Sequence, residues 1–526
     1  MKALITVILT MFAVLTLGTV LYAAPVVECG AAFGTKFNLE PAANAVPQQQ
    51  ENVDFIPNRV GVDEDLVVAG AFDARGFVTA SATWDGSLSG YYVHRSKIPD
   101  CNPQFEGGLP PIVAQGKTFP GVGGTVVAAD SVRDAFFAAD LRLDLIDSLS
   151  AIGLFRASSS TLLNPTLCPN GTHTAAQATA CWGTTAPVLI DQQGSAGANA
   201  SQDYPSLAAD ERPSKAGVGA GDVYVAFGSG IVMTLTACNG STLACSPPLT
   251  VSDTSDPPGP TDAHVEVRPD GIITVTYVDA AFPATTDTIK FVSCKPAGAP
   301  QAPVCGTPSV VAVESQPIGP SFFGQSLSGM NLLVLTAPKH ANRLEADGKT
   351  VTTFVVWDRC KTIFNFVQEQ GGLTTCLDGD VVMSTSTDGT TWSAVAPVNA
   401  GKGHQFFPSI AADASTGMIN IAYYDTAADR FDNRMRVSLN QIAPGGATVG
   451  PLLYLTSIPI PWNADPSSNP FALNDFDLHF GMKARGMGTP GHSRVYASFT
   501  STADRPGRYT GLPVPEQNNN LQKLIY

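Results

Sequence analysis

Aspartates recur at matched places along this chain, and their type and spacing make them the first candidates for chemistry. The aspartates of one set lie at the end of a hydrophobic run or directly after it. The aspartates of a second set end the hydrophobic run that precedes this one in the sequence. A ring of carboxylates on one face of a fold could bind Ca²⁺ or polarise a substrate, whereas turns use the same residue to accept backbone hydrogen bonds. No Asp-x-Asp-x-Asp calcium loop is present, so Ca²⁺ stays an alternative and no other cofactor is expected. The first set is Asp73, Asp140, Asp279, Asp358 and Asp425, and the second is Asp130, Asp210, Asp270, Asp347 and Asp413.

A second candidate group combines two tyrosines, an aspartate and several arginines near residue 425. Its members are Tyr423, Tyr424, Asp425, Arg430, Arg434 and Arg436. Strand alternation places Tyr423 and Asp425 on one face and Tyr424 on the other. A planar guanidinium pairs with a carboxylate through two hydrogen bonds, so the arginines suit an acidic group. The alternative is that one Tyr belongs to the core and the arginines are solvated at a sheet edge.

Other catalytic signatures are absent from the sequence. It contains no Gly-x-Ser-x-Gly, His-Glu-x-x-His or phosphate-loop motif. His404 opens the run before Pro408 and could lie at the rim of a site, although a lone His there is more often a hydrogen-bonded loop residue. The formal net charge is −15 with no long run of one sign, which excludes a nucleic-acid partner.

The elements that must position these residues form a repeat. The run Pro-Ser-Leu-Ala-Ala-Asp at 205–210 recurs as Pro-Ser-Ile-Ala-Ala-Asp at 408–413, and a more hydrophobic run follows each copy. Weaker copies begin near residues 59, 125, 264, 342 and 479, which makes seven units. A third apolar run, and in most units a fourth, completes each unit. Four strands per unit, repeated radially, predict an all-β propeller of four-stranded antiparallel blades, seven in number with six as the alternative.

One unit contains a distinctive hairpin turn. The run 380–384 enters a tight turn at Asp388-Gly389, and Trp392 follows as the chain leaves it. Ser386, Asp388, Gly389 and Trp392 resemble the Asp-box (BNR repeat), Ser-x-Asp-x-Gly-x-x-Trp, of sialidase-like β-propellers in the neuraminidase superfamily, here one residue tighter. The resemblance covers about Asn58 to Thr500 and implies a structural turn, since the box is a folding element. It favours six blades, because the familiar catalytic domains of that family have six.

The resemblance also implies a mechanism and shows a departure from it. Sialidase-like enzymes use a Tyr activated by a Glu, an Asp as acid/base and three arginines that hold the substrate carboxylate, which would correspond to Tyr423 or Tyr424, Asp425 and the nearby arginines. Sialidases begin with Arg-Ile-Pro, whereas this chain has Phe55-Ile56-Pro57 with Arg59 beyond. One arginine of the substrate clamp is then missing. We therefore expect a non-catalytic or degenerate module that binds a glycan or an extracellular protein, with an exo-acting glycoside hydrolase of sialidase class as the alternative.

The ten cysteines predict five disulfides. Four pairs are close in sequence and should staple local loops, and the remaining two cysteines would join the N-terminal segment to the first unit. Metal binding would prefer two-residue spacings with interleaved His, and neither occurs. The predicted pairs are Cys168–Cys181, Cys238–Cys245, Cys294–Cys305, Cys360–Cys376 and Cys29–Cys101.

The N-terminus indicates export. Residues 1–23 read as a signal peptide with an apolar run from Ala3 to Leu21, and an uncleaved membrane anchor is the alternative. We expect a secreted, periplasmic or cell-surface protein, with membrane contact only if this segment is retained. The N-terminal segment 24–57 is expected to close the ring by a strand near Val26–Leu39, and 58–526 to form a single propeller domain.

Overall fold

A computed structural model shows a chain that is almost entirely β-structure. The described residues are 26–32, 48–61, 64–73, 87–96, 103–144, 147, 149–194, 202–253, 258–281, 286–314, 325–327, 333–334, 337–365, 374–427, 434–446, 448, 453–455, 460–461, 481–486, 493–501, 506–509, 512–515 and 518–525. Helical structure within them is limited to α3 (Ser159–Leu162), α4 (Ala175–Trp182) and the 3₁₀ turn η1 (Ser214–Ala216). None of these described helices is long and apolar enough to cross a membrane.

The described strands form seven sheets of four or more strands, together with two small hairpins. The first three sheets contain β2 (Gln48–Gly61), β3 (Glu64–Asp73), β4 (Ser89–Ser96), β5 (Pro103–Gly108) and β11 (Gly171–Thr172); β8 (Gly121–Asp130), β9 (Ala135–Asp144), β10 (Leu149–Ser158) and β12 (Val188–Gly194); and β13 (Gln202–Ala209), β14 (Asp222–Ser229), β15 (Val232–Asn239) and β16 (Leu249–Thr250).

The fourth sheet has five strands, and the fifth is the largest with six. They contain β17 (Pro258–Val267), β18 (Ile273–Ala281), β19 (Asp287–Lys295), β20 (Val304–Cys305) and β21 (Ser309–Glu314); and β24 (Lys339–Leu344), β25 (Val351–Asn365), β26 (Thr374–Ser386), β27 (Ala396–Pro397), β22 (Gln325–Leu327) and β23 (Leu333–Val334).

The last two sheets lead back to the start of the chain. They contain β28 (Gln405–Ala412), β29 (Ile419–Asp425), β30 (Arg434–Ile442), β31 (Leu453–Tyr454) and β32 (Ile460–Pro461); and β33 (Gly481–Gly486), β34 (Ser493–Ser501), β37 (Asn518–Ile525) and β1 (Val26–Ala32). The two hairpins are β6 (Ile112–Ala114) with β7 (Lys117–Phe119), and β35 (Pro506–Tyr509) with β36 (Leu512–Pro515).

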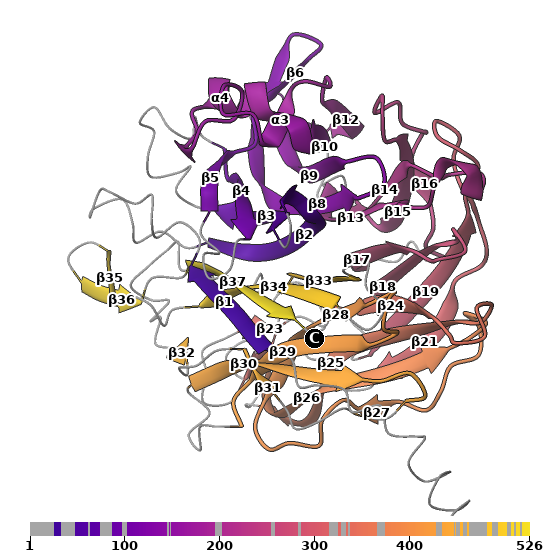
Figure 1. Ribbon diagram of the computed structural model, residues 1–526. Helices are drawn as coiled ribbons and strands as arrows, with labels where there is room; N and C mark the ends of the chain where they lie inside the picture. The colour runs from indigo at the N-terminus through magenta and orange to yellow at the C-terminus, as the bar shows by residue number, and fades with distance from the viewer. Residues whose placement is uncertain are drawn as a thin grey trace, which may run out of the picture.

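The sheets follow one another around a common centre, from the indigo first strands to the yellow last ones (Figure 1). The first strand of each sheet contacts the first strand of the next, in the order β2, β8, β13, β17, β24, β28, β33 and back to β2. Each of the seven repeat units identified in the sequence lies in one of these sheets. The prediction of an all-β propeller with four-stranded antiparallel blades is confirmed.

A repeated β-bulge shapes the innermost strands. The register shifts just before Val126, Ser206, His264 and Ser409 in four different sheets. Asp262 and Phe407, each two residues before the resumed register, have φ of 53° and 49°, and Gly124 takes φ of 64° at the matching place. A bulge bends a strand and re-aims its side chains. In these four strands the residue that follows the bulge lies at the centre of the ring.

Side chains also join neighbouring inner strands. The Asp54 carboxylate accepts the N–H of Ala129 at 2.8 Å, and Asn52 Oδ1 accepts the N–H of Val127 at 3.0 Å. Ser206 accepts the N–H of Val265 at 3.0 Å in the same way. These groups are buried or half-buried, where an unsatisfied N–H would be costly. These hydrogen bonds fix the position of each of these inner strands relative to the inner strand of the next sheet.

The ring closes between the last sheet and the first. β1 pairs with β37, which pairs with β34, so a strand from the N-terminal segment lies at the outer edge of the last sheet. Near the centre, Arg485 of β33 binds Asp54 of β2 at 2.7 Å and also pairs with Glu211. β2 begins at Gln48, so this first inner strand crosses the domain boundary expected at residue 58.

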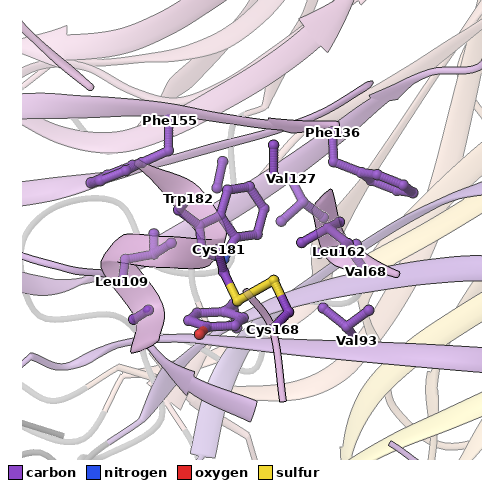
Figure 2. Packing of buried hydrophobic residues seen from close by; sticks show 14 of the residues in the cluster. Val68, Val93, Leu109, Val127, Phe136, Phe155, Leu162, Cys168, Cys181 and Trp182 are labelled. Atoms are coloured by element: carbon purple, nitrogen blue, oxygen red, sulfur yellow. A yellow bond between two sulfur atoms is a disulfide. The ribbon is translucent and has the colours of Figure 1, made fainter. Parts of the chain in front are cut away.

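Four predicted disulfides are confirmed: Cys168–Cys181, Cys238–Cys245, Cys294–Cys305 and Cys360–Cys376. Three of them lie at the third strand of a sheet or between its third and fourth strands. Cys168–Cys181 packs in a hydrophobic cluster with Trp182 and Leu162 (Figure 2). The predicted Cys29–Cys101 pair cannot be placed because Cys101 lies outside the described residues.

The turn after β26 is held by a compact set of hydrogen bonds. The Asp388 carboxylate accepts the N–H groups of Thr390 and Thr391 at 2.8 and 2.7 Å, and Ser386 Oγ accepts the N–H of Gly389 at 2.8 Å. Gly389 has φ of 73°, a conformation that favours glycine. Trp392 packs edge-on against Phe291 with ring centroids 5.2 Å apart, so this turn contacts the neighbouring sheet.

We expect Asp388→Ala to destabilise the protein at neutral pH more than Thr390→Ala, a change in the same turn at an exposed side chain. The N–H groups of Thr391 and Thr390 lower the pKa of Asp388. A lowered carboxyl pKa contributes stability above the unfolded pKa of about 4, and this is lost as pH falls. Urea unfolding should therefore show a difference between Asp388→Ala and wild type that shrinks below about pH 4. A difference that grows in acid would contradict this role.

Arg485→Met should lower the free energy of unfolding by about 3 kcal/mol or more, because it leaves Asp54 buried without its main counter-charge. The Arg485 and Asp54 side chains are only 11% and 4% exposed. Arg59→Met is the matched control: Arg59 pairs with Asp134 between the first two sheets, but both side chains are 36% exposed. Removing such a pair should cost about 1 kcal/mol or less. Equal losses in chemical denaturation would show that Arg485 does not close the ring.

Candidate functional site

A cavity of about 270 Å³ lies on the axis of the propeller. Every one of the seven innermost strands contributes to its wall, which places it at the centre of the ring. One lining residue from each strand is Asp54, Val127, Ser206, His264, Lys339, Ser409 and Lys483. The two clearest repeats both reach this region, since Pro205 and Ser206 of one copy and Ser409 of the other line it.

The wall carries acidic and basic groups, most of them in ion pairs. The Lys483 ammonium lies 3.6 Å from Glu266 Oε1, and both side chains are about one quarter exposed, at 27% and 25%. Arg485 and Asp54 form the ion pair that closes the ring. The Lys339 ammonium has no hydrogen bond or ion pair with any residue that the structure describes. Burial lowers the pKa of Lys339, and the nearby Asp262 charge opposes this effect.

Two histidines form a neutral wall beside Lys339. The His264 and His340 rings meet edge to face at 4.8 Å, with their Nδ1 atoms 3.1 Å apart. His340 also hydrogen-bonds Thr274 at 2.8 Å and Thr276 at 2.9 Å. Burial lowers the pKa of His340 to about 3 and that of His264 well below its usual value. Both rings are therefore uncharged at neutral pH.

Two carboxyl groups near Asp262 have raised pKa values. Burial, with the charges of Asp262, Asp279 and Glu314, raises the pKa of Asp287 to about 7. Burial also raises the pKa of Asp358 to about 7, although the N–H of Phe407, 3.1 Å from its Oδ2, opposes the shift. A carboxyl group with such a pKa can donate a proton near neutral pH.

No group of three or more His, Cys, Asp or Glu in the described part of the chain could hold a metal ion. The first-strand aspartates serve turns instead. Asp130 accepts the N–H of Val132, Asp347 those of Lys349 and Thr350, and Asp413 that of Ser415, at 2.8 to 3.0 Å. These are the backbone hydrogen bonds within turns that the sequence analysis weighed against a ring of ligand-binding carboxylates.

Four of the second-strand aspartates are buried, and Asp279 is half-buried. Asp73 accepts the hydroxyl of Tyr92 at 2.6 Å, and Asp140 pairs with Arg142 at 2.6 Å. Asp425 accepts the N–H of Ala427 at 2.5 Å and the hydroxyl of Ser438 at 3.2 Å. Of this set, only Asp358 combines burial with a strongly raised pKa.

Tyr423 and Tyr424 lie in β29 with their rings fully buried on opposite faces, as alternation predicts. The Tyr423 hydroxyl donates to Asn440 Oδ1 at 2.5 Å, and the Tyr424 ring stacks on Phe406 at 5.6 Å. Neither tyrosine lines the central cavity. The alternative placed one of these tyrosines in the core, and the structure buries both.

Of the arginines of that group, the structure describes the side chain of Arg436 alone, and it does not line the cavity. Arg434 begins β30 and pairs through its backbone with Pro461, and Arg430 lies outside the described residues. The Arg436 guanidinium stacks on the Tyr454 ring at 4.9 Å. Phe55 packs on Tyr496 at 4.6 Å in the core between the first and last sheets. Arg59, the other residue compared with the clamp, pairs with Asp134.

His404 is buried in hydrogen bonds. Its N–H donates to Thr426 Oγ1 at 2.7 Å, and its Nδ1 accepts the N–H of Gly379 at 3.2 Å. It is therefore a hydrogen-bonded loop residue, as the sequence favoured. Sequence reasoning did not identify Asp262, Lys339 or Lys483, which come from three different strands. The one indication of them in the sequence was that each lies in or beside a copy of the repeat. In these copies His264 and Ser409 occupy the same position as Ser206.

Comparison with known proteins gives structural likeness alone. No family model matches the chain, and no curated protein matches it. The chain is similar to an N-acetylgalactosamine deacetylase from F. plautii, at 12% identity over 64% of this chain and 92% of that one, with a TM-score of 0.33. It is similar to an α-L-arabinanase from Penicillium chrysogenum, at 9% identity over 61% and 92%, with a TM-score of 0.34. AofleA from Arthrobotrys oligospora is similar at 11% identity over 81% and 96%, with a TM-score of 0.34.

Proposed function

We propose that this protein is an exported, sialidase-like β-propeller that binds a glycan in its central cavity and does not hydrolyse it. The observation that carries the proposal is a single cavity of about 270 Å³ to which all seven inner strands contribute. Ligand sites are typically concave, with apolar walls and a few convergent polar groups. Four disulfides fit an extracellular protein.

The composition of the wall suits a sugar. Glu266 and Asp262 can accept hydrogen bonds from hydroxyl groups, and Lys483 can donate to ring or hydroxyl oxygens. Phe72 and Met482 supply apolar surface for the C–H face of a sugar ring. The volume is just below the range of about 300–1,000 Å³ for drug-sized ligands, so it suits one terminal sugar unit of a glycan.

A glycoside hydrolase is the second candidate. The raised pKa values of Asp287 and Asp358 favour it, whereas neither residue lines the central cavity. A general acid with a pKa of about 7 is protonated below that pH, so turnover should fall as pH rises through 7. Purified protein assayed on a panel of fluorogenic glycosides between about pH 5 and 8 tests this. Turnover that is lost in Asp358→Asn would establish the hydrolase in place of the binding module.

Filling the cavity should abolish binding. Ser409 is buried at the cavity wall, and Ser409→Phe should occupy much of the space that the ligand needs. Ala414→Phe, at an exposed turn after the same strand, is the matched control and should bind as wild type. A glycan array followed by calorimetry on the best ligand measures both.

If Ser409→Phe lowers the melting temperature, the smaller Ser409→Leu replaces it. A folded Ser409 variant that binds the glycan as wild type does would place the ligand elsewhere and contradict the proposed function.

A further inference from the structure

We propose that Asp287 makes the fourth sheet sensitive to pH. Its uncharged carboxyl group lets the end of β21 pack against β19, whereas its carboxylate repels Glu314 and loosens that end. This inference goes beyond the proposed function, because it concerns a contact within the fold and needs no ligand. Asp287 is the first residue of β19, and Glu314 is the last residue of β21. Neither is among the residues that the sequence singled out.

The two carboxyl groups face each other across neighbouring strands. β19 and β21 are antiparallel, and Asp287 pairs directly with Glu314 in their register. Side chains at directly opposed positions lie on the same face with Cβ atoms about 4.5–5.5 Å apart, and like charges there are destabilising. The two residues are only 1% and 6% exposed. Little water therefore reaches them to screen a repulsion between two carboxylates.

The two carboxyl groups differ in their partners. Glu314 Oε1 accepts the indole N–H of Trp357 at 2.8 Å, and the Arg359 guanidinium lies 3.7 Å from the same oxygen. Neither carboxyl oxygen of Asp287 has a hydrogen-bond partner among the residues that the structure describes. A buried carboxylate without partners is unfavourable, and such a group takes up a proton instead. Asp287 is therefore the member of the pair that is uncharged.

The charged groups around Asp287 act in the same direction. Burial is the largest cause that raises its pKa, to about 7, and the charges of nearby acids raise it further. Those acids are Asp262 on β17, Asp279 on β18 and Glu314 on β21. β20, which also pairs with β19, has no charged side chain. Lys290, the base closest to Asp287 along β19, binds Asp253 at 3.0 Å.

The folded protein therefore keeps a proton on Asp287 that the unfolded chain releases. An aspartate in an unfolded chain has a pKa of about 3.9, well below the folded pKa of about 7. The resulting stabilisation is fully present below about pH 4 and is lost as pH rises through about 7. This dependence is opposite in sign to that of Asp388, whose contribution is lost as pH falls.

Urea unfolding at about pH 5.5 and about pH 8 tests this role. Asp287→Asn keeps the shape of the uncharged carboxyl group, so it should be more stable than wild type at the higher pH. It should also reduce the ratio of the two wild-type folding constants by about 10-fold or more. Asp270→Asn is the matched control, because Asp270 follows β17 of the same sheet with a side chain that is 44% exposed. It should leave that ratio unchanged.

Hydrogen exchange over residues 309–314, corrected for the intrinsic effect of pH on amide exchange, measures the local loosening. Wild type should lose protection there between about pH 5.5 and about pH 8, and Asp287→Asn should keep it. If Asp287→Asn does not fold, Glu314→Gln replaces it, since it removes the opposing charge and keeps an acceptor for Trp357. Either of two results would overturn the inference: a ratio of folding constants that is the same in wild type and the folded variant, or protection of wild-type β21 that does not change with pH.

Discussion

The Arg485 guanidinium, held between Asp54 and Glu211, ties the last sheet to the first and third around the channel. A propeller depends on this closure, because an open ring would leave the edges of its first and last blades unpacked. At the outer edge of the closing sheet, β1 from the start of the chain pairs with β37 from its end. Closure at the centre and at the rim fixes the spacing of all seven inner strands, and that spacing defines the cavity.

Charge is distributed unevenly inside this ring. The ion pairs of Arg485 and Lys483 are satisfied and serve the fold, and the His264–His340 pair is neutral. Around Asp262 the pattern changes: Lys339 has no acidic partner among the described residues, and Asp287 has a carboxyl pKa near 7. Proteins tolerate such costs mainly where a ligand or a reaction uses them. Asp262 and Lys339 line the cavity from the fourth and fifth sheets, and this is why we place recognition there.

The repeats and cysteine spacings were sufficient to predict much of the fold, because each is a local pattern. The Pro-Ser-x-Ala-Ala-Asp copies mark inner strands, and close cysteine pairs mark hairpin ends. The site could not be found in this way, since Asp262, Lys339 and Lys483 meet only after three distant strands converge. Alternation correctly separated Tyr423 from Tyr424. It could not show that both faces of a middle strand are covered by neighbouring sheets, which buries both rings.

The central claim is that the ligand lies on the propeller axis, and a crystal structure of the protein with its bound glycan tests it most directly. The account predicts electron density for one sugar unit in the central cavity, with its polar groups within hydrogen-bond distance of Lys339 and Asp262. Density on the outer strands of a blade, with the cavity holding only water, would contradict it.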